Sequence, residues 1–276
     1  MGAFLWVWFL GALAYTVDVF TGQHNMNDIF ASMSVAQITF VAAGVLFAAL
    51  MRAFSGFGFA LMAVPVFSLF LIPGDAVVLS ALLTLVVSGL TYKAWFGKYP
   101  AGLMRPMVIG SIVGTGVGVY FLSHLSVEQF QLWIGLSVVT ACLLLARFKP
   151  RETTGSPALA GATGIGSGLM NGAFAIPGPP VIVYVMATIH DPVKSRAFLM
   201  AFFIASNAIS LMMFWIAGLV TSTPFYLLLV AFPVMLLGDR LGAWLFQRVG
   251  GQAYRPVALV VSLGVGVAIT AKALLS

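Results

Sequence analysis

Apolar runs follow one another along almost the whole chain, with turn residues and few charges between them. From residue 35 onward, ten such runs can be delimited. The runs cover residues 35–54, 57–72, 76–96, 103–122, 127–148, 158–171, 174–189, 193–220, 225–247 and 256–271. A bilayer core about 30 Å thick is crossed by a helix of about 20 apolar residues. The pattern therefore predicts an all-α polytopic membrane protein whose runs form transmembrane or re-entrant helices.

The composition excludes a soluble globular protein and leaves no room for a large domain outside the membrane. Hydrophobic residues make up 61% of the 276 residues and charged residues 7%, whereas soluble domains carry about a quarter charged residues. Lipid must therefore solvate most of the surface, and we expect no enzyme. The formal net charge of +6 comes from basic residues that stand singly or in small groups between apolar runs. It indicates membrane topology and no nucleic-acid partner.

Cysteine and histidine are too few to build a metal centre or a disulfide. Cys142 is the single cysteine, and His24, His124 and His190 lie far apart in the sequence. We expect no metal and no cofactor. Residues 1–34 contain a shorter apolar stretch without a preceding Lys or Arg, so we expect an extra span or an interfacial helix there rather than a cleaved signal peptide.

The two sets of five runs resemble each other and are joined by a cytoplasmic hinge at residues 149–157. Three ordered anchors relate them: S-G-x8-P begins at Ser55 and Ser167 (167 minus 55, offset 112), Asp75 matches Asp191 (offset 116), and G-x3-G begins at Gly114 and Gly238 (offset 124). We predict a first repeat over residues 35–148 and a second over 158–276. Because each holds an odd number of segments, the second would enter the membrane from the opposite face.

Basic residues fall on every other loop. Of the 13 Lys and Arg residues, 11 occupy these loops: Arg52, Lys93, Lys98, Arg105, Arg147, Lys149, Arg151, Lys194, Arg196, Arg248 and Arg255. The positive-inside rule assigns this side to the cytoplasm, and inverted repeats of this kind are typical of secondary transporters. The alternation of basic loops does not distinguish whether the first two segments of each half span the membrane or are re-entrant, because both options leave the later loops on the same side.

Glycine interrupts the first two segments of each half. Helices broken at membrane depth are tolerated where they line a cavity or are buried in protein, and their N-terminal ends attract anions. The alternative is that these small residues only permit close helix packing. On the first interpretation, the substrate-binding residues are Ser55, Gly56 and Gly58 in one half and Ser167, Gly168, Asn171 and Gly172 in the other.

Further polar residues occur inside the apolar runs. Thr91 and Asn207 each follow the paired aspartates by 16 residues (91 minus 75, 207 minus 191), so both are expected at matching depth, either as substrate contacts or as polar links between helices. Arg52 either complements an anion or only marks the inner side of the membrane. Asp239 and Arg240 interrupt the ninth run, where charge is costly, and either couple transport to protons or form structural ion pairs.

The stretch from Ser55 to Pro65, its partner from Ser167 through Gly172 to Val181, and the segment from Gly238 to Gly242 resemble the TauE/SafE family of membrane permeases. This family is also called the sulfite exporter or toluene-sulfonate permease family. The likeness extends over nearly the whole chain from about Phe40. It implies transport of sulfur-containing anions, such as sulfite, sulfoacetate or other organosulfonates, across a bacterial inner membrane.

We therefore expect a carrier that exports a small sulfur-containing anion by alternating access, with the anion bound at the ends of broken helices. The expected partners are the anion and the lipid bilayer, and a homo-oligomer is left open. Two alternatives remain at this point. One is proton-coupled uptake of an organosulfonate or another organic anion, and the other is a channel or an accessory membrane subunit.

Overall fold

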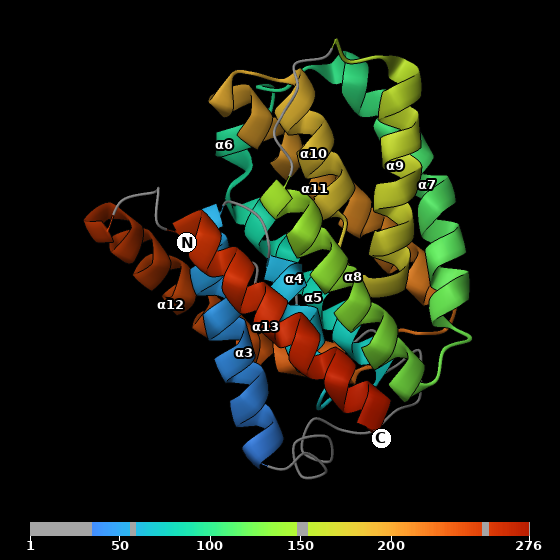
Figure 1. Cartoon of the computed structure of the whole chain (residues 1–276), viewed down its shortest axis with the longest axis vertical. Helices are drawn as coiled ribbons and strands as arrows, with labels where there is room; N and C mark the ends of the chain where they lie inside the picture. The colour runs from blue at the N-terminus through green and yellow to red at the C-terminus, as the bar shows by residue number, and fades with distance from the viewer. Residues whose placement is uncertain (1–34, 56–58, 148–153, 250–253, 276) are drawn as a thin grey trace.

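The computed structural model describes residues 35–55, 59–147, 154–249 and 254–275, which form helices without a strand (Figure 1). The expectations for residues 1–34, for Gly56 and Gly58 and for residues 149–153 of the hinge lie outside the described residues. The helices are α3 (Val35–Ser55), α4 (Phe59–Phe67), α5 (Pro73–Leu90), α6 (Tyr92–Trp95), α7 (Ala101–Leu122), α8 (Val127–Arg147), α9 (Pro157–Phe174), α10 (Gly178–Thr188), α11 (Pro192–Ile216), α12 (Thr223–Val249) and α13 (Tyr254–Leu275).

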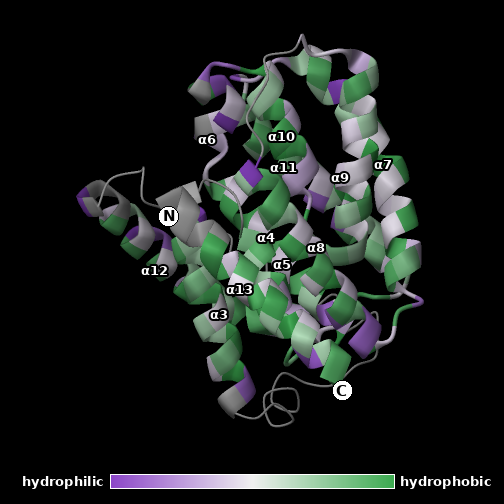
Figure 2. Ribbon diagram, viewed as in Figure 1, coloured by the Kyte–Doolittle hydropathy of each residue, from purple (hydrophilic) through white to green (hydrophobic). Residues whose placement is uncertain are grey.

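Within the described part, five helices are long and apolar enough to cross a membrane. They are Pro73–Leu90, Ala101–Leu122, Val127–Arg147, Val193–Ile216 and Thr223–Leu245. Large apolar side chains point away from the protein on these helices, including Ile109, Tyr120 and Trp215, which are 64%, 69% and 65% exposed. Hydrophobic residues also cover most of the ribbon in Figure 2. The expected class, an all-helical membrane protein, is confirmed.

The second segment of each half is shorter than its apolar run. The run at 57–72 yields only the nine residues of α4, and the run at 174–189 yields the 11 residues of α10. At 1.5 Å per residue, nine residues rise about 14 Å, less than half of a bilayer core. The end of α4 lies inside the apolar run and so is not visible in the hydropathy pattern. There the Ser68 hydroxyl donates to the Pro65 carbonyl at 2.7 Å, and the chain turns before α5 begins at Pro73.

The run at 76–96 also divides, because it contains the end of α5. The Thr91 hydroxyl donates to the Val87 and Ser88 carbonyls, at 3.0 and 3.3 Å, and Thr91 lies between α5 and the short helix α6. The indole N–H of Trp95 in α6 donates back to the Ser88 carbonyl at 3.0 Å. These bonds hold the C-terminal end of α5 in a fixed place beside α11, which contacts both helices.

The helices pack mainly in pairs that join the two halves of the chain. In Figure 1, α7 and α9 run side by side along one edge of the molecule, and α8 and α13 cross its front face. The other two main pairs are α3 with α12 and α5 with α11. The largest apolar core lies among α3, α4, α5 and α12, and it also takes in Phe130 and Cys142 of α8.

Glycines bring α7 and α9 into backbone contact. A Cβ atom added at Gly110, Gly114 or Gly118 of α7 would lie under 3.0 Å from a backbone oxygen of α9. The same holds in reverse for Gly164 and Gly168 of α9, and for Gly172, against α7. Helices in membranes associate through such close contacts. No side chain larger than hydrogen fits at these positions without moving one of the helices.

Candidate functional site

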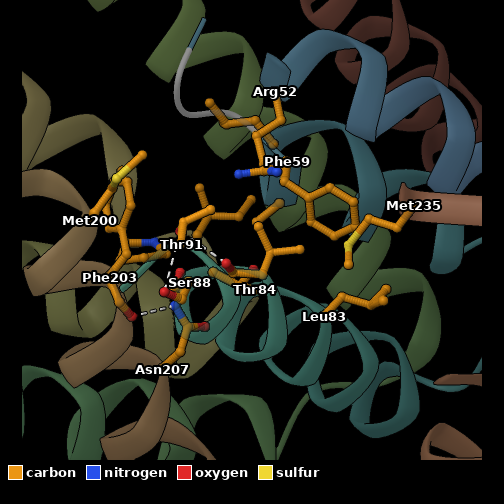
Figure 3. A pocket seen from close by; sticks show the side chains of 16 residues that line it. Arg52, Phe59, Leu83, Thr84, Ser88, Thr91, Met200, Phe203, Asn207 and Met235 are labelled. Atoms are coloured by element: carbon orange, nitrogen blue, oxygen red, sulfur yellow. Dashed lines mark hydrogen bonds between the residues drawn. The ribbon is translucent and has the colours of Figure 1, made fainter. Parts of the chain in front are cut away.

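A cavity of about 60 Å³ lies where α3, α4, α5, α10, α11 and α12 converge (Figure 3). A single buried water needs about 10–15 Å³ of such space, and drug-sized ligands occupy several hundred. The cavity therefore suits a small ion or molecule. Its walls are mostly apolar, with Phe59, Leu83, Phe203 and Met235 among the residues that line it.

The first turn of α4 forms one wall of the cavity. Phe59, Ala60 and Leu61 all line it. The first four N–H groups of a helix have no partner within the helix, and together with the helix dipole they favour an anion. Proline is absent from these first residues, so each can offer its N–H group.

The stretch that leads into α10 also lines the cavity. The chain reaches it from α9 through Ala175, whose φ of 53° is left-handed, and the Ala175 N–H donates to the Asn171 carbonyl at 2.8 Å. Ile176, Pro177 and Gly178 then line the cavity. Proline lacks an N–H group, and three prolines stand at positions 177, 179 and 180. Both helix starts were expected to attract an anion, and that of α10 offers fewer N–H donors than that of α4.

Arg52, near the end of α3, lines the cavity and carries the only charge among the described lining residues. Its Nη2 donates to Oδ2 of Asp239 on α12 in an ion pair, with both side chains 22% exposed. Nε of Arg52 and Oδ1 of Asp239 are buried and have no hydrogen-bond partner among the described residues. Arg240, the neighbour of Asp239, is exposed.

Thr91 and Asn207, the residues expected at matching depth, both line the cavity (Figure 3). The Asn207 amide donates to the Phe203 carbonyl at 2.8 Å, and its buried Oδ1 has no partner. Thr84 and Ser88 also line the cavity and were not singled out from the sequence. The spacing of 84 and 88 places both on one face of α5, in line with Thr91 just beyond its end, which is the signal that could have found them.

The remaining expected site residues of the second half face other helices. The Ser167 hydroxyl donates to the Pro177 carbonyl at 2.5 Å and so supports the turn into α10. Asn171 donates to Ser206 and Ser210 of α11, with its amide nitrogen 2.9 and 2.6 Å from their hydroxyl oxygens. Gly168 and Gly172 contact α7. None of these four is among the described residues that line the cavity.

In the first half, Ser55 is the last residue of α3. The cavity thus brings together Arg52, Thr91 and Asn207 with the starts of two short helices. Over the described part of the chain, no three His, Cys, Asp or Glu side chains gather as metal ligands would. A positive charge, the first turn of a helix and neutral polar side chains in a small apolar cavity are suited to holding a small anion without chemical change.

A family model described as Sulfite exporter TauE/SafE matches residues 40–269 of the chain. The match includes every described residue that lines the cavity. Searches among curated proteins and among solved structures found no match.

Proposed function

Because the chain belongs to the sulfite exporter TauE/SafE family and is a membrane transporter, we propose that it carries a small sulfur-containing anion and binds it in the cavity beside Arg52. The observation that carries this proposal is that the Arg52 side chain and the N-terminal turn of α4 line the same cavity. Both favour an anion, and both lie at a break between helices. The cavity size favours sulfite or a short organosulfonate over an aromatic sulfonate.

We further propose that the two halves are inverted repeats, in which α3, α4, α5, α7 and α8 correspond to α9, α10, α11, α12 and α13. The packing supports this correspondence. The contact of α3 with α12 has the contact of α9 with α7 as its counterpart. The contacts of α5 with α11 and of α8 with α13 each join a helix to its own counterpart. A site between such repeats is suited to alternating access.

Under this proposal, α3–α4 and α9–α10 are the broken segments whose ends meet at the cavity. An anion that moves alone is driven out of a cell by an inside-negative potential, worth about 2.3 kcal/mol per charge per 100 mV. Export across a bacterial inner membrane is therefore the direction of uncoupled movement. Uptake requires a coupling ion.

Anion binding to the purified full chain in detergent is the first test. Sulfite, methanesulfonate, isethionate, taurine, sulfate, acetate and chloride are compared at one pH and ionic strength by thermal unfolding. A ligand that binds the folded state raises its apparent stability by mass action. We expect one or two sulfur anions to stabilise the protein, and Arg52→Gln to abolish the shift. Arg105→Gln, which removes an exposed charge on α7, is the matched control and should leave it intact.

Counterflow in liposomes separates a carrier from a channel. Vesicles loaded with an excess of the unlabelled stabilising anion should accumulate the labelled anion transiently, because a carrier exchanges one for the other. Flux without counterflow would indicate a channel. If no sulfur anion stabilises the wild-type protein, or if Arg52→Gln binds as tightly as wild type, the proposed site is wrong.

A further inference from the structure

Arg52 stands between two places for a negative charge. On one side its guanidinium donates to the Asp239 carboxylate. On the other it lines the cavity, as do Thr84, Ser88 and Thr91 (Figure 3). Asp239 itself is not among the described residues that line the cavity. The carboxylate thus pairs with Arg52 from outside the cavity.

The surroundings of Asp239 provide little other charge. Of the described helices, α3 and α5 pack against α12 most extensively. Arg52 is the only charged residue of α3, and the only one of α5 is Asp75, in its first turn, where Thr221 donates to it at 2.6 Å. Thr84, Ser88 and Thr91 lie more than two helical turns beyond Asp75. On α12 itself, Arg240 is exposed and Arg248 stacks on Trp244.

A bound anion changes this balance. With the cavity empty, Arg52 and Asp239 sum to zero charge. A monovalent anion at Arg52 would leave two negative charges beside one positive charge in an environment where water screens them weakly. A buried charge without a partner is costly. A proton on Asp239 restores neutrality, and the protonated carboxyl still accepts a hydrogen bond from Arg52.

We propose that Asp239 is the proton acceptor that accompanies the anion: the anion binds at Arg52 while a proton binds the Asp239 carboxylate, and both cross the membrane together. This inference rests on the proposed function. The charge of the site is zero before and after binding. For a monovalent anion, transport is then electroneutral, so a pH difference replaces the membrane potential as the driving force. An inward proton gradient would drive uptake, the direction that an uncoupled anion does not take.

Methanesulfonate is the probe, since the anion of a strong acid keeps its charge between pH 5 and pH 8. Its dissociation constant is measured by calorimetry on the full chain across this range, in pairs of buffers with different ionisation enthalpies. Linked binding of one proton raises the affinity by up to about tenfold for each unit of pH decrease. Proton uptake appears as a difference in heat between the paired buffers.

Asp239→Asn removes the titrating group and the competing negative charge. We expect this variant to bind methanesulfonate at pH 8 at least tenfold more tightly than wild type, with no pH dependence and no proton uptake. Asp191→Asn is the matched control, because Asp191 is an exposed N-cap whose role asparagine can fill. It should keep the wild-type pH dependence.

A measurement on the wild-type protein alone guards against misfolding of the variant. In liposomes with a potassium-clamped potential, methanesulfonate flux should be unaffected by voltage and accompanied by alkalinisation of the side that the anion leaves. Voltage-driven flux without proton movement would overturn the inference, as would unchanged pH dependence in Asp239→Asn. Both leave the anion site standing. Absence of saturable anion binding by wild type at every pH would instead remove the proposed function.

Discussion

Asn207 and Asn171 are buried asparagines of the second half, and they meet different neighbours. Asn207 lines the cavity and has a buried amide oxygen without a partner. The nitrogen of Asn171 lies within hydrogen-bond distance of the Ser206 and Ser210 hydroxyls of α11. Neither amide oxygen has a partner among the described residues, but only Asn207 lines the cavity, whereas the Asn171 nitrogen links α9 to α11. Their roles can therefore be separated by mutation.

Asn207→Ala should weaken anion binding with little loss of stability. Asn171→Ala should lower stability with little effect on anion binding. Removal of the Asn171 amide leaves two buried hydroxyls without that partner, which costs about 1–3 kcal/mol in stability. Dissociation constants and thermal unfolding of the two variants provide the measurement. Equal effects of both variants on anion affinity would show that Asn171 also acts at the site.

Ala175 is the one described residue other than glycine with a positive φ, at 53°. An L-residue in this region is strained by about 1–2 kcal/mol, so Ala175→Gly should raise the thermal unfolding temperature. Ala173→Gly, two residues earlier inside α9, should lower it, because glycine in a helix interior costs about 0.5–1 kcal/mol. The same sign for both changes would contradict this account of the turn.

Part of the site is predictable at this scale and part is not. Arg52, Thr91 and Asn207 stand out as polar residues in apolar runs, and the structure places all three at the cavity. Ser167 and Asn171 stand out in the same way but face a turn and a neighbouring helix. The sequence shows which residues share a helix face. The sequence does not show whether that face meets a cavity or another helix, because polar residues such as serine and asparagine occur in both places.

Among the elements, α7 and α9 form the closest contact, and glycine makes it close. Gly114 lies against the backbone of Ile165, so Gly114→Ala should force the helices apart and lower stability by more than about 2 kcal/mol. Gly102 lies in the same helix with open space around its Cβ position. Gly102→Ala should therefore stabilise the helix by about 0.5–1 kcal/mol. Thermal unfolding of both variants checks the prediction, and a tolerated Gly114→Ala would contradict the packing.

Apolar runs predict the order of the elements, since each run from 35 to 271 contains at least part of a helix. They predict helix ends poorly where the turn is itself apolar. Leu69, Phe70 and Leu71 continue the run beyond α4 although the helix ends at Phe67. Hydropathy reports burial in protein or lipid, and a buried turn is as apolar as a buried helix.

At the scale of the whole molecule, two contacts between the halves differ, although the proposed repeat makes them counterparts. They are the contact of α7 with α9 and the contact of α3 with α12. The α7–α9 contact is made by backbone against backbone along several turns. The α3–α12 contact has Gly238 close to Ala49 and Leu46 but also includes the Arg52–Asp239 ion pair. Under the proposed repeat, Arg52 would correspond to Gly164 (offset 112) and Asp239 to Thr115 (offset 124). The charged pair therefore occurs in one of the two contacts.

This asymmetry predicts where the protein responds to its ligand. Saturating methanesulfonate should change amide hydrogen exchange in α3 and α12, whose ion pair the anion perturbs, and leave α7 and α9 unchanged. Exchange reports local opening, and mass spectrometry of peptides from the four helices resolves it. Sodium chloride at equal ionic strength is the control. Equal changes in both helix pairs would show that the two contacts open together.

The prolines at the start of α10 have a further consequence for the carrier between transport cycles. A carrier that returns empty exposes its binding groups to whatever solvent the cavity admits. N–H groups at the start of α4 need water when no anion is present, whereas Pro177, Pro179 and Pro180 have no N–H group to hydrate. Water in the cavity should therefore gather mainly beside Arg52 and the first turn of α4, because the stretch that leads into α10 offers fewer N–H groups. The proposed carrier would then return with one wall more hydrated than the other.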